Sequence, residues 1–93
     1  MDSHDLRRTY VFSGQVQGVG FRMTSQRIAA DYPVRGYVRN LDDGRVELVV
    51  EGEPATLDAY EAALSARMGG YIDRTQRKEE PAAGGFEGFR IRF

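Results

Sequence analysis

A glycine-rich segment that ends in an arginine holds the residue types best suited to chemistry. It runs from Ser13 to Arg22 and carries glycine at positions 14, 18 and 20. Glycine permits positive φ angles and a close approach of the backbone to a ligand, because it has no Cβ. Backbone N–H groups just before a helix start can converge on one point and favour an anion there. Arg22 would add a fork of donors that matches phosphate or carboxylate oxygens. The segment therefore predicts an anion-binding loop.

Glycine-rich connections between a strand and a helix are common, so the glycines alone do not separate an anion site from a simple turn. The spacing also differs from two well-known nucleotide loops. No Lys-Ser or Lys-Thr pair follows the last glycine, and the sequence has no G-x-G-x-x-G pattern. These differences argue against a Walker-type or a Rossmann nucleotide site.

The composition limits the remaining possibilities. Ninety-three residues with 41% hydrophobic and 29% charged side chains predict one globular domain over residues 1–93, with a polar N-terminal tail over residues 1–7. The absence of cysteine excludes disulfides and thiolate chemistry, and the single histidine, His4, lies in the tail. The net charge of -1 argues against a broad nucleic-acid surface. The N-terminus lacks the apolar core of a signal peptide, so we expect a cytoplasmic protein.

Alternating and helical patterns of apolar residues predict the secondary structure. The segment before the glycines, Thr9 to Phe12, is β-branched and aromatic, and an Asp-Gly turn at Gly44 favours a hairpin. The predicted helices cover residues 22–30 and 55–68, the second with an apolar stripe of Leu57, Tyr60, Leu64 and Met68. The remaining predicted elements are strands at 34–40, 45–51, 71–76 and 86–93, and a charged loop at 77–85.

This order predicts an α+β fold: a ferredoxin-like β-α-β-β-α-β sandwich, an antiparallel sheet with two helices on one face, and an extra C-terminal strand. In such a sheet the first and second strands are parallel and are separated by the third. Asn40, at the end of the second strand, is therefore expected at the same sheet edge as the anion loop. Two strand spacings put these strands about 10 Å apart.

Two motifs together resemble the signatures of the acylphosphatases. They are Gly14-x-Val16-Gln17-Gly18-Val19-x-Phe21-Arg22 and Gly36-Tyr37-Val38-Arg39-Asn40-x-x-x-Gly44-x-Val46, followed by Gly52 and by a terminal Phe89-x-Ile91-Arg92-Phe93. The resemblance runs from about Tyr10 to Phe93. Two differences stand out: Gln15 lies where many relatives have a basic residue, and Tyr37 where many have tryptophan.

The resemblance implies a small, metal-independent hydrolase that cleaves the carboxyl-phosphate bond of acyl phosphates. It implies that Arg22 binds the phosphate, that Asn40 orients the attacking water, and that no cofactor is needed. The loop that would hold the phosphate consists of Gln15, Val16, Gln17, Gly18, Val19, Gly20, Phe21 and Arg22. Inorganic phosphate or sulfate is expected to bind this loop. We expect a monomer that binds neither nucleic acid nor membranes.

The chemistry agrees with these residue types. An acyl phosphate has a carboxylate leaving group of low pKa, so positioning and charge stabilisation should suffice. No side chain is an obvious general base, and the substrate phosphate is the hypothesised proton acceptor. Asn40 beside an Asp-Gly turn could also be only a turn residue. The alternatives are a non-catalytic phosphate-binding module and an RNA-binding module, because Arg35-Gly36-Tyr37-Val38 is similar to the start of an RNA-contact motif.

Overall fold

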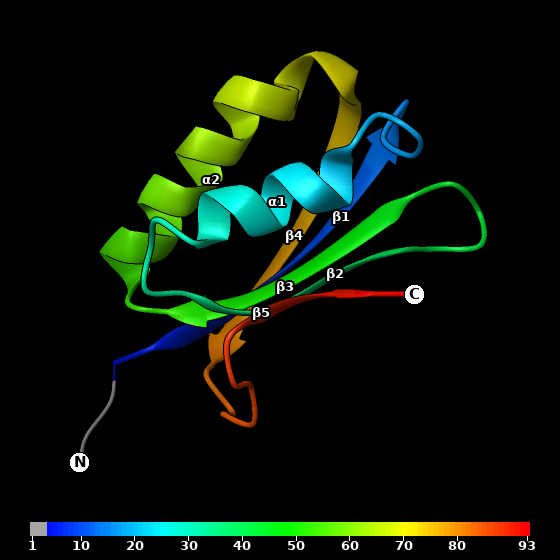
Figure 1. The fold of residues 1–93 in the computed structure, drawn as a ribbon. Helices are drawn as coiled ribbons and strands as arrows, with labels where there is room; N and C mark the ends of the chain where they lie inside the picture. The colour runs from blue at the N-terminus through cyan, green and yellow to red at the C-terminus, as the bar shows by residue number, and fades with distance from the viewer. Residues whose placement is uncertain (1–3) are drawn as a thin grey trace.

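The computed structural model describes residues 4–93 as a five-stranded sheet with two helices packed on one face (Figure 1). This confirms the ferredoxin-like α+β prediction. The elements are β1 (Leu6–Gly14), α1 (Phe21–Ala29), β2 (Arg35–Asn40), β3 (Val46–Gly52), α2 (Pro54–Met68), a 3-10 turn (Gly69–Tyr71), β4 (Ile72–Pro81) and β5 (Phe89–Arg92). Neither helix of this described part is long and apolar enough to cross a membrane.

The strands lie in the order β4-β1-β3-β2-β5, and the first four pair antiparallel. The last strand differs from the predicted antiparallel sheet, because β5 pairs parallel to β2. The chain leaves β4 at Pro81, which is paired with Leu6 at the sheet end where β2 begins. A strand that enters the sheet from that end must run in the direction of β2. The sheet is therefore mixed.

Several boundaries were wrong in the sequence prediction, among them the start of β5, predicted at residue 86 and observed at Phe89. Leu6 and Arg7 belong to β1, so the polar tail is shorter than residues 1–7, and residues 1–3 of it lie outside the described part. The expected loop at 77–85 is strand as far as Pro81, and the true connection covers residues 82–88. β4 is an edge strand with charged side chains on both faces, and edge strands commonly lack the apolar alternation of inner strands.

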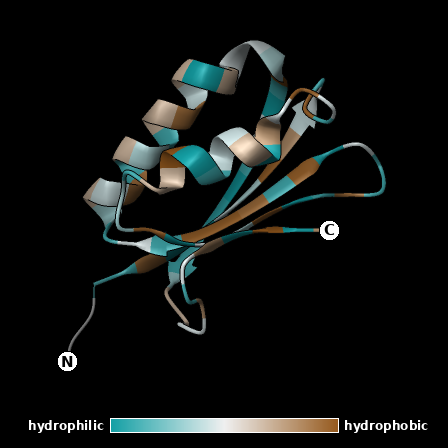
Figure 2. Ribbon diagram, viewed as in Figure 1, coloured by the Kyte–Doolittle hydropathy of each residue, from teal (hydrophilic) through white to brown (hydrophobic). Residues whose placement is uncertain are grey.

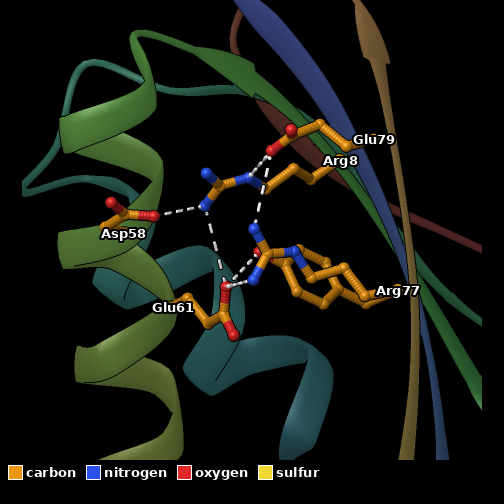
Figure 3. A network of polar contacts seen from close by, with 6 residues as sticks. Arg8, Asp58, Glu61, Arg77 and Glu79 are labelled. Atoms are coloured by element: carbon orange, nitrogen blue, oxygen red, sulfur yellow. Dashed lines mark hydrogen bonds and ion pairs between the residues drawn. The ribbon is translucent and has the colours of Figure 1, made fainter.

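A network of charged groups joins α2 to the sheet (Figure 3). Arg8 of β1 is only 4% exposed, and its guanidinium pairs with Asp58 of α2 at 2.7 Å and with Glu79 of β4 at 2.8 Å. The hydroxyl of Tyr10 donates to Glu61 of α2 at 2.6 Å. The hydrogen bond from Arg8 lowers the pKa of Glu79. A buried arginine is tolerated only when it is paired, so this network fixes where α2 lies on β1 and β4.

The apolar core lies between the helices and the sheet. Figure 2 shows long hydrophobic stretches, in brown, along the strands that the helices cover. The predicted stripe of α2 is confirmed, since Leu57, Tyr60, Leu64 and Met68 are all buried. The Tyr60 hydroxyl donates to the main-chain oxygen of Ser25 at 2.9 Å, which ties α2 to α1. Phe93, expected on a half-buried strand, is instead fully exposed beyond the end of β5.

Candidate active site

The loop between β1 and α1 is shaped by two glycines and held by two buried side chains. Gly18 and Gly20 both have φ of 78°, a left-handed conformation, with open space where a Cβ would lie. Glycine is thus required there by backbone conformation rather than by crowding. Val16 and Phe21, at 0% and 2% exposure, anchor the loop in the core. The backbone between these anchors is left at the surface.

The N–H groups of this loop are available to a ligand. From Gln15 to Gly20 the main-chain N–H groups donate no hydrogen bond to other groups within residues 4–93. Gly20 is the N-cap of α1 and has no side chain to cap it, and the first turn of α1 contains no acidic residue. The positive end of the helix dipole therefore lacks a partner from the protein and favours an anion.

Arg22 and Asn40 line the same cavity, of about 160 Å³, at this loop. The other lining residues are Val16, Gly18, Gly20, Phe21 and Met23. Within the described range the Arg22 guanidinium has no carboxylate partner; its Nη1 donates to the main-chain oxygen of Arg92 at 3.4 Å. The Phe93 ring centroid lies 4.8 Å from its Cζ. A cation at a helix N-terminus is unfavourable without an anion, so the cavity is suited to a negatively charged ligand.

The pairing of β3 explains how Asn40 reaches this cavity. Val46 of β3 pairs with Phe12 of β1 on one side and with Asn40 of β2 on the other. Asn40 and the end of β1 therefore lie at the same level of the sheet, as expected from the strand order. The Asn40 side chain makes no hydrogen bond to another residue in the range 4–93, so its amide is free to bind a ligand or water.

Gln17 connects the loop to the turn that follows Asn40. Its Nε2 donates to the main-chain oxygens of Leu41, at 2.8 Å, and Arg45, at 3.0 Å. The Gln17 side chain thus holds two segments of the cavity together instead of pointing at a ligand. Gln15, Gln17 and Val19 do not line the cavity, although all three belong to the loop.

Sequence reasoning missed two apolar residues at this site. Met23 lines the cavity and is 62% exposed, and Phe93 stacks on Arg22. The available signal was that Met23 directly follows Arg22 at the start of a helix. Nothing local in the sequence indicates that the Phe93 ring contacts a residue so distant along the chain.

The fold and this cavity define a small α+β domain with a cavity suited to an anion. A family model for the acylphosphatases matches residues 8–91. An acylphosphatase of Rubrobacter xylanophilus is 46% identical over 90 residues, which cover 91% of this chain and 77% of that protein. The chain belongs to the acylphosphatase family, and it is an enzyme of that family.

Solved structures agree with this assignment. A crystal structure of an acylphosphatase from Bacillus subtilis superposes with a TM-score of 0.84 at 30% identity, covering 95% of this chain and 99% of that one. A full-length HypF, solved in phosphate- and nucleotide-bound form, contains a similar domain with a TM-score of 0.80 at 25% identity. That match covers 100% of this chain but only 12% of HypF.

Proposed function

We propose that this protein hydrolyses acyl phosphates to a carboxylate and inorganic phosphate, with the phosphate held by the loop from Gln15 to Arg22 and water held by Asn40. The observation that carries the proposal is that Arg22 and Asn40 line one cavity beside unpaired loop N–H groups. Family membership supports the same activity.

The binding step follows from the charges of the cavity. The phosphoryl oxygens would accept hydrogen bonds from the loop N–H groups and from the Arg22 fork. These donors are arranged before the substrate arrives, because Val16 and Phe21 hold the loop in the core. Donors that need no reorganisation stabilise the charge of a phosphoryl-transfer transition state effectively.

The chemical step needs water in line with the bond that breaks. We place that water on the Asn40 amide, opposite the leaving carboxylate. The water oxygen forms the new bond to phosphorus, the bond from phosphorus to the carboxylate oxygen breaks, and the carboxylate leaves with the electron pair. A phosphate oxygen of the substrate accepts the water's proton. Arg22 compensates the charge on the phosphoryl oxygens throughout.

The direct test is hydrolysis of acetyl phosphate and benzoyl phosphate in the presence of EDTA. We expect both substrates to be hydrolysed at the same rate with and without the chelator, since the proposed step uses only protein groups. Release of inorganic phosphate measures the rate. No hydrolysis of either substrate by the purified protein would refute the proposal, and loss of activity with EDTA that Mg²⁺ restores would refute its metal-independence.

Replacement of Gln17 with alanine should lower kcat/KM about tenfold or more, because it frees the loop from the turn beside Asn40. Misplacement of catalytic groups by about 1 Å can cost about 10²-fold in rate. The loss of two hydrogen bonds should cost about 1 to 3 kcal/mol of unfolding free energy. Gln76→Ala is the matched control, since Gln76 is exposed on β4. Equal kcat/KM in the Gln17 and Gln76 variants would contradict a positioning role for Gln17.

The RNA-binding alternative receives less support. Tyr37 is the strand aromatic that would stack on a base, and the guanidinium of Arg92 lies 3.8 Å from the centroid of its ring. Phe86 packs against the same ring in an edge arrangement. A ring covered in this way offers little face to a base.

We further infer a cytoplasmic monomer that takes a small anionic substrate, and inorganic phosphate or sulfate should compete for the loop.

A further inference from the structure

The segment 82–88 has no part in the proposed reaction, yet it is firmly attached to the sheet. It connects β4 to β5 on the side of the sheet away from the helices (Figure 1). The N–H groups of Ala83 and Gly84 donate to the Glu51 carboxylate at 2.9 and 3.1 Å. At its other end, the Gly36 N–H donates to the main-chain oxygen of Gly88 at 2.9 Å. Hydrogen bonds at both ends therefore hold the segment against this face of the sheet, and it is not a loose connection.

Glu51 is the centre of this attachment. It is 0% exposed and also accepts a hydrogen bond from Arg7 Nε at 2.7 Å. Burial acts to raise the pKa of Glu51, but the hydrogen bonds from Ala83, Arg7 and Gly84 more than offset it and lower the pKa. The carboxylate thus stays ionised at neutral pH and keeps the segment in place.

The attached segment encloses a second cavity, of about 160 Å³, on the opposite face of the sheet from α1 and α2. Its lining residues come from the adjacent strands β2 and β5 and from the segment itself. The side chains that give it chemical character are Tyr37, Phe86, Glu87, Arg90 and Arg92, and the remaining lining residues are glycines. A cavity of this size suits a small molecule, since drug-sized ligands occupy about 300 to 1,000 Å³.

The two arginines of this cavity differ from the other arginines on the same face. Arg7, Arg35 and Arg39 pair with carboxylates at 2.7, 2.9 and 2.7 Å. Arg90 and Arg92, by contrast, have no ion pair or side-chain hydrogen bond within the described range 4–93. Two guanidinium groups that share a cavity with a single carboxylate, that of Glu87, leave a net positive charge that favours an oxyanion.

The charge and the rings of the cavity narrow the class of ligand. With Arg90, Arg92 and Glu87 in the lining, the formal charge is +1, which suits one monoanion better than a phosphate dianion. The Phe86 ring packs edge-on to Tyr37 with centroids 6.0 Å apart, and Arg7 lies 5.1 Å from the Phe86 centroid. These contacts hold an apolar wall beside the charged one.

We propose that this cavity is a second anion site, separate from the one at Arg22, which binds a small monocarboxylate with a flat apolar group. The carboxylate would accept hydrogen bonds from Arg90 and Arg92, and the apolar group would pack against Phe86. The inference does not rest on the proposed function, because no residue of the Arg22 cavity takes part in it.

Benzoate is the probe for this site. It is titrated into ¹⁵N-labelled protein at constant ionic strength, with inorganic phosphate present in excess to occupy the Arg22 cavity. We expect saturable amide shifts at Tyr37 and at residues 85–90, with a Kd on the order of 1 mM. Acetate, which lacks the flat group, should bind at least about fivefold more weakly because it forms no contact with Phe86.

Arg90→Gln removes one guanidinium whose side chain makes no hydrogen bond in the described part, so the variant should fold normally. It should weaken benzoate binding about tenfold, the usual scale for one charge-assisted contact. Arg67→Gln, at an exposed arginine near the end of α2, is the control and should leave the Kd unchanged. Absence of saturable shifts at residues 85–90 would overturn the proposal, as would a benzoate Kd that rises with the phosphate concentration or an unchanged Kd in Arg90→Gln.

Discussion

Replacement of Arg22 with alanine is expected to lower kcat/KM for benzoyl phosphate by about 10³-fold or more, the scale at which an arginine contributes to phosphoryl transfer. Arg22 has no carboxylate partner in the described residues and lines the cavity beneath the loop. Its loss should therefore weaken both the ground-state binding of phosphate and the stabilisation of the transition state. Inhibition by inorganic phosphate should be lost with the activity.

Two further variants test how the Arg22→Ala result is interpreted. Arg22→Lys keeps the charge but loses the planar fork, so it should recover only part of the phosphate affinity and little of the activity. Arg67→Ala, at an exposed helix arginine away from the cavity, should behave as wild type. Phosphate inhibition that survives unchanged in Arg22→Ala would contradict the binding role of Arg22.

Replacement of Asn40 with alanine is expected to lower kcat by about 10² to 10³-fold, as the loss of one aligned catalytic group does in other enzymes. The inhibition constant of inorganic phosphate should stay within about twofold of wild type, because the loop donors and Arg22 remain in place. The Asn40 variant should therefore lose turnover and keep phosphate binding, whereas the Arg22 variant should lose both. Steady-state kinetics with phosphate as a competitive inhibitor measures both quantities.

Arg39→Ala is the matched control for Asn40. Arg39 is adjacent in the chain but is exposed and pairs with Glu47 at 2.7 Å outside the cavity. It should retain full activity. Wild-type kcat in Asn40→Ala would show that another group positions the water, and a large rise in the phosphate inhibition constant would show that Asn40 binds phosphate instead.

Local patterns in the sequence predicted much of the fold. The apolar stripe of α2 and the Asp-Gly turn before β3 depend on side chains within a few residues, so their elements were predictable. β4 was predicted too short because its strand character comes from pairing with β1, from Leu6↔Pro81 to Tyr10↔Arg77, and not from its own apolar pattern. The parallel direction of β5 likewise depends on where β4 ends.

By itself, the sequence determined which groups could bind an anion. Glycine at positions 18 and 20 is required by positive φ, and Arg22 at the start of a helix is a cation that needs an anion; both are local properties. The strand order predicted that Asn40 lies at the sheet edge of the loop, but tertiary structure alone decided the contacts that fix this arrangement, because they join residues far apart in the chain. Gln17 reaches Leu41 and Arg45. Val46 aligns Asn40 with the end of β1. Contacts of this kind depend on how the strands order themselves around one core, which no local pattern encodes.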